Sequence, residues 1–237
     1  MSLKFKECLK SKSEHYAQID KFRAFRLYER YKKAFCELKI IQIIGTNGKG
    51  STGRFLAQLL NTLNVSVAHY TSPHIFEFNE RFWQNGRLLR DDELNLAHET
   101  LAQMMSDEDL QSLSYFEYAT FLAALSFKEC DFVVFEAGLG AEFDATSVFD
   151  KILSVFTPIS YDHTQILGEN LLGIARTKLK VMAKKAVISS TQEEAVLNLA
   201  YKIALLKNAT LYKSDKFIAL QDKEFTNTLK NYTKKHN

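Results

Sequence analysis

Hydrophobic and polar positions follow two different rhythms along the chain. Short apolar runs of four or five residues alternate with longer segments in which apolar side chains recur every three or four positions. The short runs are typical of buried strands, and the longer segments are typical of amphipathic helices. The pattern predicts strands at 40–44, 65–69, 132–135, 152–156 and 186–189, and helices at 14–38, around 55–63, and at 91–105, 114–128, 169–183 and 192–206.

The order of these elements predicts an α/β fold. Strands and helices that alternate with short connections form a mostly parallel sheet with helices on both faces. Asp91 and Asp92 favour a helix start at this point, because carboxylates stabilise the positive end of the helix dipole. The last fifteen residues lose apolar periodicity and turn basic, which indicates a frayed end. The 237 residues are expected to form a single domain, 1–237, with its core at about 15–210.

Composition and charge narrow the class of protein. The chain has 46% hydrophobic and 25% charged residues, as in ordinary soluble globular proteins. Its net charge of +3 permits an anionic substrate, but 31 basic residues are nearly balanced by 28 acidic ones, so nucleic-acid binding is not expected. No apolar run approaches the roughly 20 residues that span a bilayer, and the N-terminus lacks an apolar signal core. Cys8, Cys36 and Cys130 lack metal-ligand spacing and are expected to be reduced thiols of a cytoplasmic protein without membrane contact.

Three of the nine glycines fall within eight positions after the first predicted strand, which read Gly45-Thr46-Asn47-Gly48-Lys49-Gly50-Ser51-Thr52. A buried strand, a glycine-rich turn and a helix N-terminus together form an anion site, because backbone N–H groups converge there without a Cβ in the way. Lys49 is expected to contact the outer phosphates of a nucleotide, and Ser51 or Thr52 to offer a hydroxyl to Mg²⁺. The spacing differs from GxxxxGK[ST], because Gly50 separates the lysine from the hydroxyl. The loop predicts nucleotide phosphate binding.

Four further motifs follow this loop at compatible spacings: YTSPHIFEFNERF at 70–82, YFEYATF at 115–121, FEAGLGAEFDAT at 135–146 and DHTQILGENLLGIARTK at 162–178. Together the five motifs resemble the folylpolyglutamate synthase and dihydrofolate synthase family, a branch of the Mur ligase superfamily, over roughly residues 15–190. The resemblance implies a P-loop NTPase-like Mur ligase central domain. It implies a monomeric ligase that uses ATP to phosphorylate a carboxylate of dihydropteroate or a reduced folate. L-glutamate then attacks the acyl phosphate and forms an amide.

The resemblance also implies two Mg²⁺ sites. Ser51, Ser72 and Glu136 match the ligands of the first, and Glu136 ends an apolar strand beside the phosphate loop. His163 and Lys178 match the second site, and Lys49, His163 and Lys178 are the expected catalytic residues. The family carries a carbamylated lysine at the place of Lys178, and a carbamate offers the anionic oxygen that Mg²⁺ prefers. Because Thr177-Lys178-Leu179-Lys180 replaces the usual Glu-Lys-Ala-Gly, Lys180 stays open as the modified residue.

Other matched residues belong to the expected folate site. Ser72-Pro73-His74 resembles the substrate loop, Phe116 would stack on the pterin ring, and Asp144 would accept its hydrogen bonds. The family pattern Gly-Gly-Arg-Leu-Asp-Ala-Thr-Asn corresponds here to Gly140-Ala141-Glu142-Phe143-Asp144-Ala145-Thr146-Ser147. Arginine has thus become Glu142 and asparagine has become Ser147, which leaves the substrate preference open. Arg81 also fits the family pattern, with a surface salt bridge as the alternative.

Two other functions stay open. One is a Mur-type ligase acting on a peptidoglycan precursor, against which the segments 72–74 and 115–117 argue. The other is a noncatalytic nucleotide-binding module. Family members also carry a second, smaller α/β domain that closes over the nucleotide and helps to form the glutamate site, and this chain is expected to lack it. Since closure completes such sites, the isolated chain is expected to be inactive or nearly so.

Overall fold

The computed structural model describes residues 4–12, 20–35 and 37–215. An eight-stranded sheet runs through this part of the chain. The strands are β1 (Ile40–Ile44), β2 (Val67–Tyr70), β3 (Phe82–Gln84), β4 (Arg87–Leu88), β5 (Phe132–Glu136), β6 (Lys151–Phe156), β7 (Lys185–Ile188) and β8 (Thr210–Lys213). Their order across the sheet is β4-β3-β2-β5-β1-β6-β7-β8. All neighbours pair in parallel except β2 with β3 and β3 with β4, which are antiparallel. The expected mostly parallel α/β sheet is confirmed.

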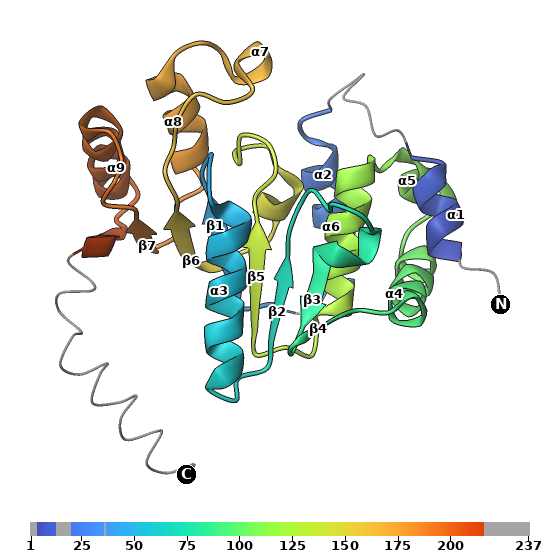
Figure 1. The fold of residues 1–237 in the computed structure, drawn as a ribbon. Coiled ribbons are helices and arrows are strands. Elements are labelled where there is room, and N and C mark those ends of the chain that lie inside the picture. Colours follow the sequence, from blue (N-terminus) through green and yellow to red (C-terminus); the bar gives the residue numbers. More distant parts are fainter. Residues whose placement is uncertain (1–3, 13–19, 36, 216–237) are drawn as a thin grey trace, which may run out of the picture.

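Helices cover both faces of this sheet (Figure 1). One face is covered by α2 (Arg23–Tyr31), α4 (Asp91–Met104), α6 (Tyr115–Ser126), α8 (Leu171–Leu179) and α9 (Glu194–Leu206). The opposite face packs against α3 (Lys49–Thr62). Strand β1 shows the division, since Ile40 and Ile44 contribute to the first face while Ile41 and Ile43 pack toward α3. This alternation follows from the two-residue period of side chains along a strand.

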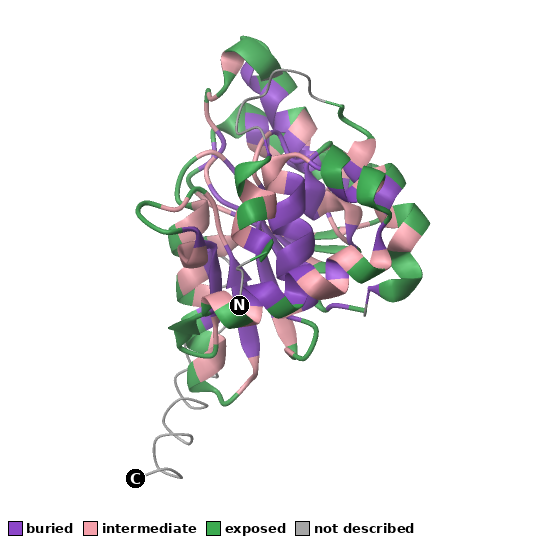
Figure 2. Ribbon diagram, turned by 90° about the vertical axis from the view of Figure 1, so that its right-hand side faces the viewer, coloured by how far each residue is buried: buried purple, intermediate pink, exposed green. Residues whose placement is uncertain are grey.

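The core consists of the central strands and the inner sides of the helices (Figure 2). All five residues of β1 are buried, as expected for a parallel strand that is covered on both faces. Helix α6 is also buried almost all round and lies between the sheet and α4. Aromatic side chains fill this layer, with the ring of Phe149 packing edge-on against those of Phe35 and Phe135.

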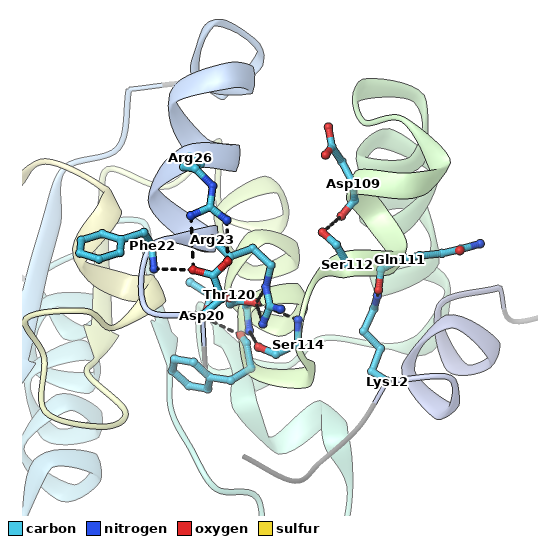
Figure 3. A network of polar contacts seen from close by, with 12 residues as sticks. Lys12, Asp20, Phe22, Arg23, Arg26, Asp109, Gln111, Ser112, Ser114 and Thr120 are labelled. Carbon is cyan, nitrogen blue, oxygen red and sulfur yellow. Dashed lines mark hydrogen bonds and ion pairs between the residues drawn. The ribbon is translucent and has the colours of Figure 1, made fainter. Parts of the chain in front are cut away.

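Ionic contacts fasten α2 to the start of α6 (Figure 3). Asp20 accepts hydrogen bonds from the backbone N–H of Phe22 at 3.0 Å and from Arg26 Nη2 at 2.5 Å. Arg23 Nε donates to Glu117 Oε2 at 2.7 Å, and the same carboxylate accepts from the backbone N–H of Ser114 at 2.8 Å. Glu117 therefore closes a capping box and an interhelix ion pair at once, which fixes the segment leading into residues 115 and 116.

The first predicted helix is shorter than expected. The pattern predicts a helix over 14–38, whereas α2 ends at Tyr31 and a 3₁₀ turn over Lys32–Ala34 leads into the next strand. Residues 13–19 and 36 lie outside the described residues, as do Cys36 and the expected frayed end at 223–237. Cys8 and Cys130 are free thiols, as predicted. None of the helices in the described ranges is long and apolar enough to cross a bilayer.

Several short elements were not predicted: the hairpin of β3 and β4, the strand β8, and the helices α1 (Lys4–Lys10), α5 (Asp107–Ser112) and α7 (Thr164–Leu167). The hairpin turns at Asn85-Gly86, whose φ angles of 47° and 92° are both positive. Asn-Gly is the strongest sequence signal for such a two-residue turn. The hairpin could therefore have been found from the sequence.

Candidate functional site

The predicted phosphate loop lies at the carboxyl end of β1 and is tied to the segment that follows β6. The backbone N–H groups of Thr46 and Asn47 donate to Pro158 O, at 3.0 and 3.4 Å. The Thr46 hydroxyl donates to Ser160 O at 3.0 Å and accepts from Ser160 N at 3.1 Å. At Gly45 a Cβ would lie 2.0 Å from Thr157 Oγ1 and 2.9 Å from Thr157 O, so only glycine permits this close approach.

Glycines also shape the start of α3. Gly48 precedes the helix with φ at 77°, a conformation that favours glycine. A Cβ at Gly50 would lie 3.2 Å from Thr71 Oγ1 and 3.3 Å from Glu136 Oε2, so this glycine lets the helix N-terminus approach the carboxylate. The first backbone N–H groups of a helix have no partner inside it. The N-terminus of α3 thus offers backbone N–H donors beside the loop, and the anion site expected at Gly45 to Thr52 stays a prediction.

Glu136 ends β5 and is buried beside the loop. Its Oε2 accepts hydrogen bonds from the Thr71 hydroxyl and, at 3.3 Å, from the backbone N–H of Ser72, while its Oε1 lies 4.0 Å from Lys49 Nζ. Burial raises the pKa of this carboxyl, and the Thr71 hydrogen bond and the Lys49 charge oppose the rise. The structure thus brings three of the predicted residues, Lys49, Ser72 and Glu136, into one polar group.

Lys178 approaches the same loop from α8. Its side chain is buried, and Nζ donates to Gly45 O at 3.0 Å. Burial lowers its pKa to about 8, and the positive charge of Lys49 adds to the effect. Lys180, the alternative candidate, is instead exposed and forms an ion pair with Glu142 at 2.6 Å. The geometry therefore favours Lys178 over Lys180 as the lysine of the loop.

A cavity of about 560 Å³ opens beside the phosphate loop. Seven of its lining residues were predicted as site residues: Lys49, Ser72, Pro73, His74, Phe116, Asp144 and His163. The peptide bond between Ser72 and Pro73 is cis. His163 is exposed, with Nε2 at 3.5 Å from Asp162 Oδ1. Residues from the phosphate loop and from the expected folate site thus share one cavity.

The chain resembles known proteins over most of its length, although no family model matches it. The dihydrofolate synthase/folylpolyglutamate synthase of Buchnera aphidicola is 36% identical over 206 residues, which cover 84% of this chain and 49% of that protein. The crystal structure of Helicobacter pylori folylpolyglutamate synthetase superimposes with a TM-score of 0.79 at 45% identity, covering 88% of this chain and 52% of that one. The chain belongs to the folylpolyglutamate/dihydrofolate synthase family.

Structures with bound molecules also lie among the matches. Escherichia coli FolC in complex with DHPP and ADP has a TM-score of 0.76 at 28% identity, covering 90% of this chain and 51% of that one. The Mycobacterium tuberculosis folylpolyglutamate synthase complexed with ADP has a TM-score of 0.78 at 26% identity, covering 89% and 49%. The chain spans about half the length of the family members it matches, and it corresponds to their N-terminal, ATP-binding half.

Asp144 lies at the cavity wall, and all four of its acceptor positions are in use. Oδ2 accepts from the backbone N–H groups of Gly138 and Leu139 at 3.0 and 3.1 Å. Oδ1 accepts from Thr146, from its backbone N–H at 3.0 Å and its hydroxyl at 2.5 Å. Burial nevertheless raises the pKa of Asp144 to about 6. A pterin that bonds to this carboxylate would have to replace one of these donors, because a carboxylate has about four acceptor positions.

Arg81, which fits the family pattern, also lines this cavity. It is buried rather than in a surface salt bridge, and its Nε donates to His74 Nδ1 at 2.9 Å. Its guanidinium lies 5.2 Å from the ring centre of Tyr115, and both residues line the cavity. The motif Asn79-Glu80-Arg81-Phe82 contains Arg81, but only the fold shows that Arg81 holds His74 in place.

The oxygen donors beside the loop fit Mg²⁺. Within residues 4–12, 20–35 and 37–215, no group of three or more His, Cys, Asp or Glu side chains could hold a metal ion. Mg²⁺ in nucleotide sites usually takes only one or two carboxylates and completes its shell with phosphates and water. Glu136, whose Oε1 lies 4.0 Å from Lys49 Nζ, is a carboxylate of this kind. Ser51 and Ser72 add hydroxyl groups on neighbouring segments.

Proposed function

We propose that this chain is the ATP-binding part of a ligase that adds L-glutamate to dihydropteroate, to a reduced folate, or to both. One observation carries the proposal: Lys49 of the phosphate loop lines the same cavity as Phe116 and Asp144, the residues expected to bind the pterin ring of the substrate. A carboxylate held there would lie within reach of a nucleotide phosphate. The E. coli relative, whose structure contains DHPP and ADP, supports this pairing of ligands.

The chemistry explains why cations and oriented dipoles gather here. Attack of a carboxylate on the γ-phosphate brings two anions together, so positive charge and N–H donors must stabilise them. Lys49 would supply the charge, and the N-terminus of α3 would supply the donors. Mg²⁺, when bound, would neutralise further phosphate charge, and Glu136, Ser51 and Ser72 are the residues that would hold it.

Lys178 would act in carbamylated form. A neutral amine is needed to attack CO₂, giving R–NH–COO⁻ and a released proton, and the pKa of about 8 leaves an appreciable neutral fraction near pH 7.5. Lys180 lacks this environment, since it is exposed and paired with Glu142. Labelling with ¹³CO₂ should give one carbamate signal that Lys178→Met removes and Lys180→Met retains. The opposite result would assign the modification to Lys180.

Calorimetry with ADP and Mg²⁺ tests the nucleotide half of the proposal. Lys49→Met should weaken ADP binding by roughly tenfold to a hundredfold, as expected when a charged hydrogen-bond donor to phosphate is lost. The exposed Lys128, replaced in the same way, is a matched control and should leave the affinity unchanged. Equal affinities of the Lys49→Met variant and the parent would contradict the assignment of the loop.

Binding of the substrate that accepts glutamate, called the acceptor here, distinguishes the ligase from a noncatalytic nucleotide-binding module. Dihydropteroate and tetrahydrofolate should each be titrated against the chain with ADP present, with Phe116→Leu as the variant. Binding that this substitution weakens supports the ligase, since a stacked aromatic ring contributes beyond its buried area. Nucleotide binding without binding of either acceptor would support the module.

A further inference from the structure

A second cavity, of about 550 Å³, lies at the opposite end of the central strands from the phosphate loop. Strands β1 and β6 run parallel, with Ile40 beside Lys151 and Ile44 beside Phe156. The phosphate loop follows Ile44, whereas Lys151, at the other end of this pair, lines the second cavity. The two cavities share no lining residue.

Positive charge predominates in this amino-end cavity. Its wall carries three ammonium groups, on Lys151, Lys184 and Lys207, and two carboxylates, on Glu142 and Asp150. Glu142 is already paired with the neighbouring Lys180 at 2.6 Å. The site therefore has cations in excess of the anions that could balance them.

Lys151 differs from the other two lysines in its contacts within the described ranges. Lys184 Nζ donates to Lys207 O, and Lys207 Nζ donates to Lys180 O, each at 2.8 Å. Lys151 Nζ has no hydrogen bond or ion pair with any described residue. Burial lowers its pKa to about 8, and the charge of Lys207 lowers it further, against the attraction of Asp150. Asp150 is exposed, so it compensates the burial of this ammonium only in part, and an anion in the cavity would add to that compensation.

The rest of the wall fits the apolar body of a ligand. Phe25, Phe149 and Met182 lie around the cationic part. The Ser147 hydroxyl accepts from Gln42 Nε2 at 2.9 Å, so its own hydrogen stays available to a ligand oxygen. Glu142 and Ser147 are also two of the four positions at which residues 140–147 depart from the family pattern. Both departures line this cavity, and neither lines the one beside the phosphate loop.

We propose that the amino-end cavity binds a small organic carboxylate, whose charge pairs with Lys151 and whose apolar body lies against Phe25, Phe149 and Met182. The Lys151 ammonium and the Ser147 hydroxyl match a singly charged head group, and the apolar wall matches an organic body that inorganic phosphate lacks. The proposal concerns a ligand site separate from the proposed ligase chemistry, so the failure of one leaves the other intact.

Benzoate and benzyl alcohol form a matched pair of probes, because they differ mainly in charge. Each should be titrated into the ¹⁵N-labelled chain carrying Lys49→Met, which weakens competing anion binding at the phosphate loop. Benzoate should shift the backbone amides of 147–151 and 184 saturably, and leave those of 45–50 unchanged. Lys151→Met should weaken benzoate binding by about tenfold or more. Lys151→Arg, which keeps the cation, should bind within about threefold of the parent.

Three outcomes would overturn the proposal. Benzyl alcohol that binds as well as benzoate would show a merely apolar cavity. Amide shifts confined to 45–50 would place the anion at the phosphate loop. Benzoate binding that survives Lys151→Met, while the matched Lys128→Met control behaves the same, would deny Lys151 its role. If Lys151→Met does not fold, Lys151→Gln replaces it in the same comparison.

Discussion

Two lysines at opposite ends of the central sheet have a pKa lowered to about 8, yet their surroundings differ. Lys178 lies at the carboxyl end and donates to Gly45 O at 3.0 Å. Lys151 lies at the amino end and has no such partner among the residues described. In both cases burial is the main cause and a second lysine is the next, Lys49 for the first and Lys207 for the second.

Lys178 is thus positioned by a hydrogen bond within the chain, whereas Lys151 has none with the described residues. Lys178 is held against the phosphate loop by a backbone carbonyl, so its direction is fixed before any ligand arrives. Lys151 retains its full hydrogen-bonding capacity. Strongly shifted lysines gather at functional sites, and the proposals above assign one to each end of the sheet.

The largest expected effect comes from Gly45→Ala, which would disturb the hydrogen bond from Lys178 to Gly45 O and leave the surroundings of Lys151 unchanged. The new Cβ would lie 2.9 Å from Thr157 O and still closer to Thr157 Oγ1, so backbone as well as side chain must move. We expect a loss of about 3 kcal/mol in the free energy of unfolding, typical of severe overpacking. Urea denaturation measures it. The Lys178 amine should lose its acceptor at the same time.

Gly48→Ala is the matched control for this substitution. No atom lies within 4 Å of the added Cβ, and only the positive φ of 77° opposes it. The cost should be about 1 kcal/mol, the usual penalty for a left-handed alanine. Equal losses for Gly45→Ala and Gly48→Ala would show that crowding against Thr157 is unimportant.

The next largest effect is expected from Asp144→Asn. Asp144 raises the pKa of both Lys178 and Lys151, so it is the charge that the two ends share. The amide would place an NH₂ group against backbone N–H donors that the carboxylate now satisfies, and at least two hydrogen bonds would be lost. We expect a loss of about 2 kcal/mol in the free energy of unfolding. The exposed Asp150, replaced by asparagine, should change it by less than about 0.5 kcal/mol. Similar losses for both would show that the hydrogen bonds to Asp144 contribute little to stability.

The sequence predicts the central fold because periodicity there is strong. β1, α3, α4 and α6 all lie close to their predicted positions, since continuous apolar runs and three-to-four spacing persist over the whole element. The hairpin of β3 and β4 was missed because its strands have only three and two residues. β8, at the sheet edge, has only exposed and half-buried positions, so no buried run marks it.

The sequence indicated candidate residues for the site, but it did not predict the contacts between them. Glycine spacing and family motifs identified Lys49, Glu136 and Lys178 as candidates. The hydrogen bond from Lys178 to Gly45 joins residues 133 positions apart, and such pairings depend on how strands and helices assemble. The amino-end cavity was not predicted, because its wall combines α2, residues 142–151, the segment between α8 and β7, and Lys207 after α9.

A smaller effect should appear in the pH dependence of stability. Between about pH 8 and the unfolded value near 10.5, the unfolded chain binds more protons than the folded chain at Lys151 and Lys178. The free energy of unfolding should therefore rise with pH across this window. Lys151→Met and Lys178→Met should each reduce the rise, and Lys128→Met should not. A rise unchanged by both substitutions would show that neither lysine is shifted in the folded protein.

The smallest effect tests whether the two lysines titrate independently. Asp162 raises the pKa of Lys178 and Asp150 raises that of Lys151. Asp162→Asn should therefore lower the pKa of Lys178 alone, and Asp150→Asn that of Lys151 alone, as followed by ¹³Cε chemical shifts of labelled lysines. Each change should be smaller than the shift caused by burial, since burial is the leading cause at both sites. Because benzoate would replace Asp150 as the counter-charge, it should raise the pKa of Lys151 in Asp150→Asn while leaving Lys178 unchanged. A rise in the pKa of both lysines would show that benzoate does not bind specifically near Lys151.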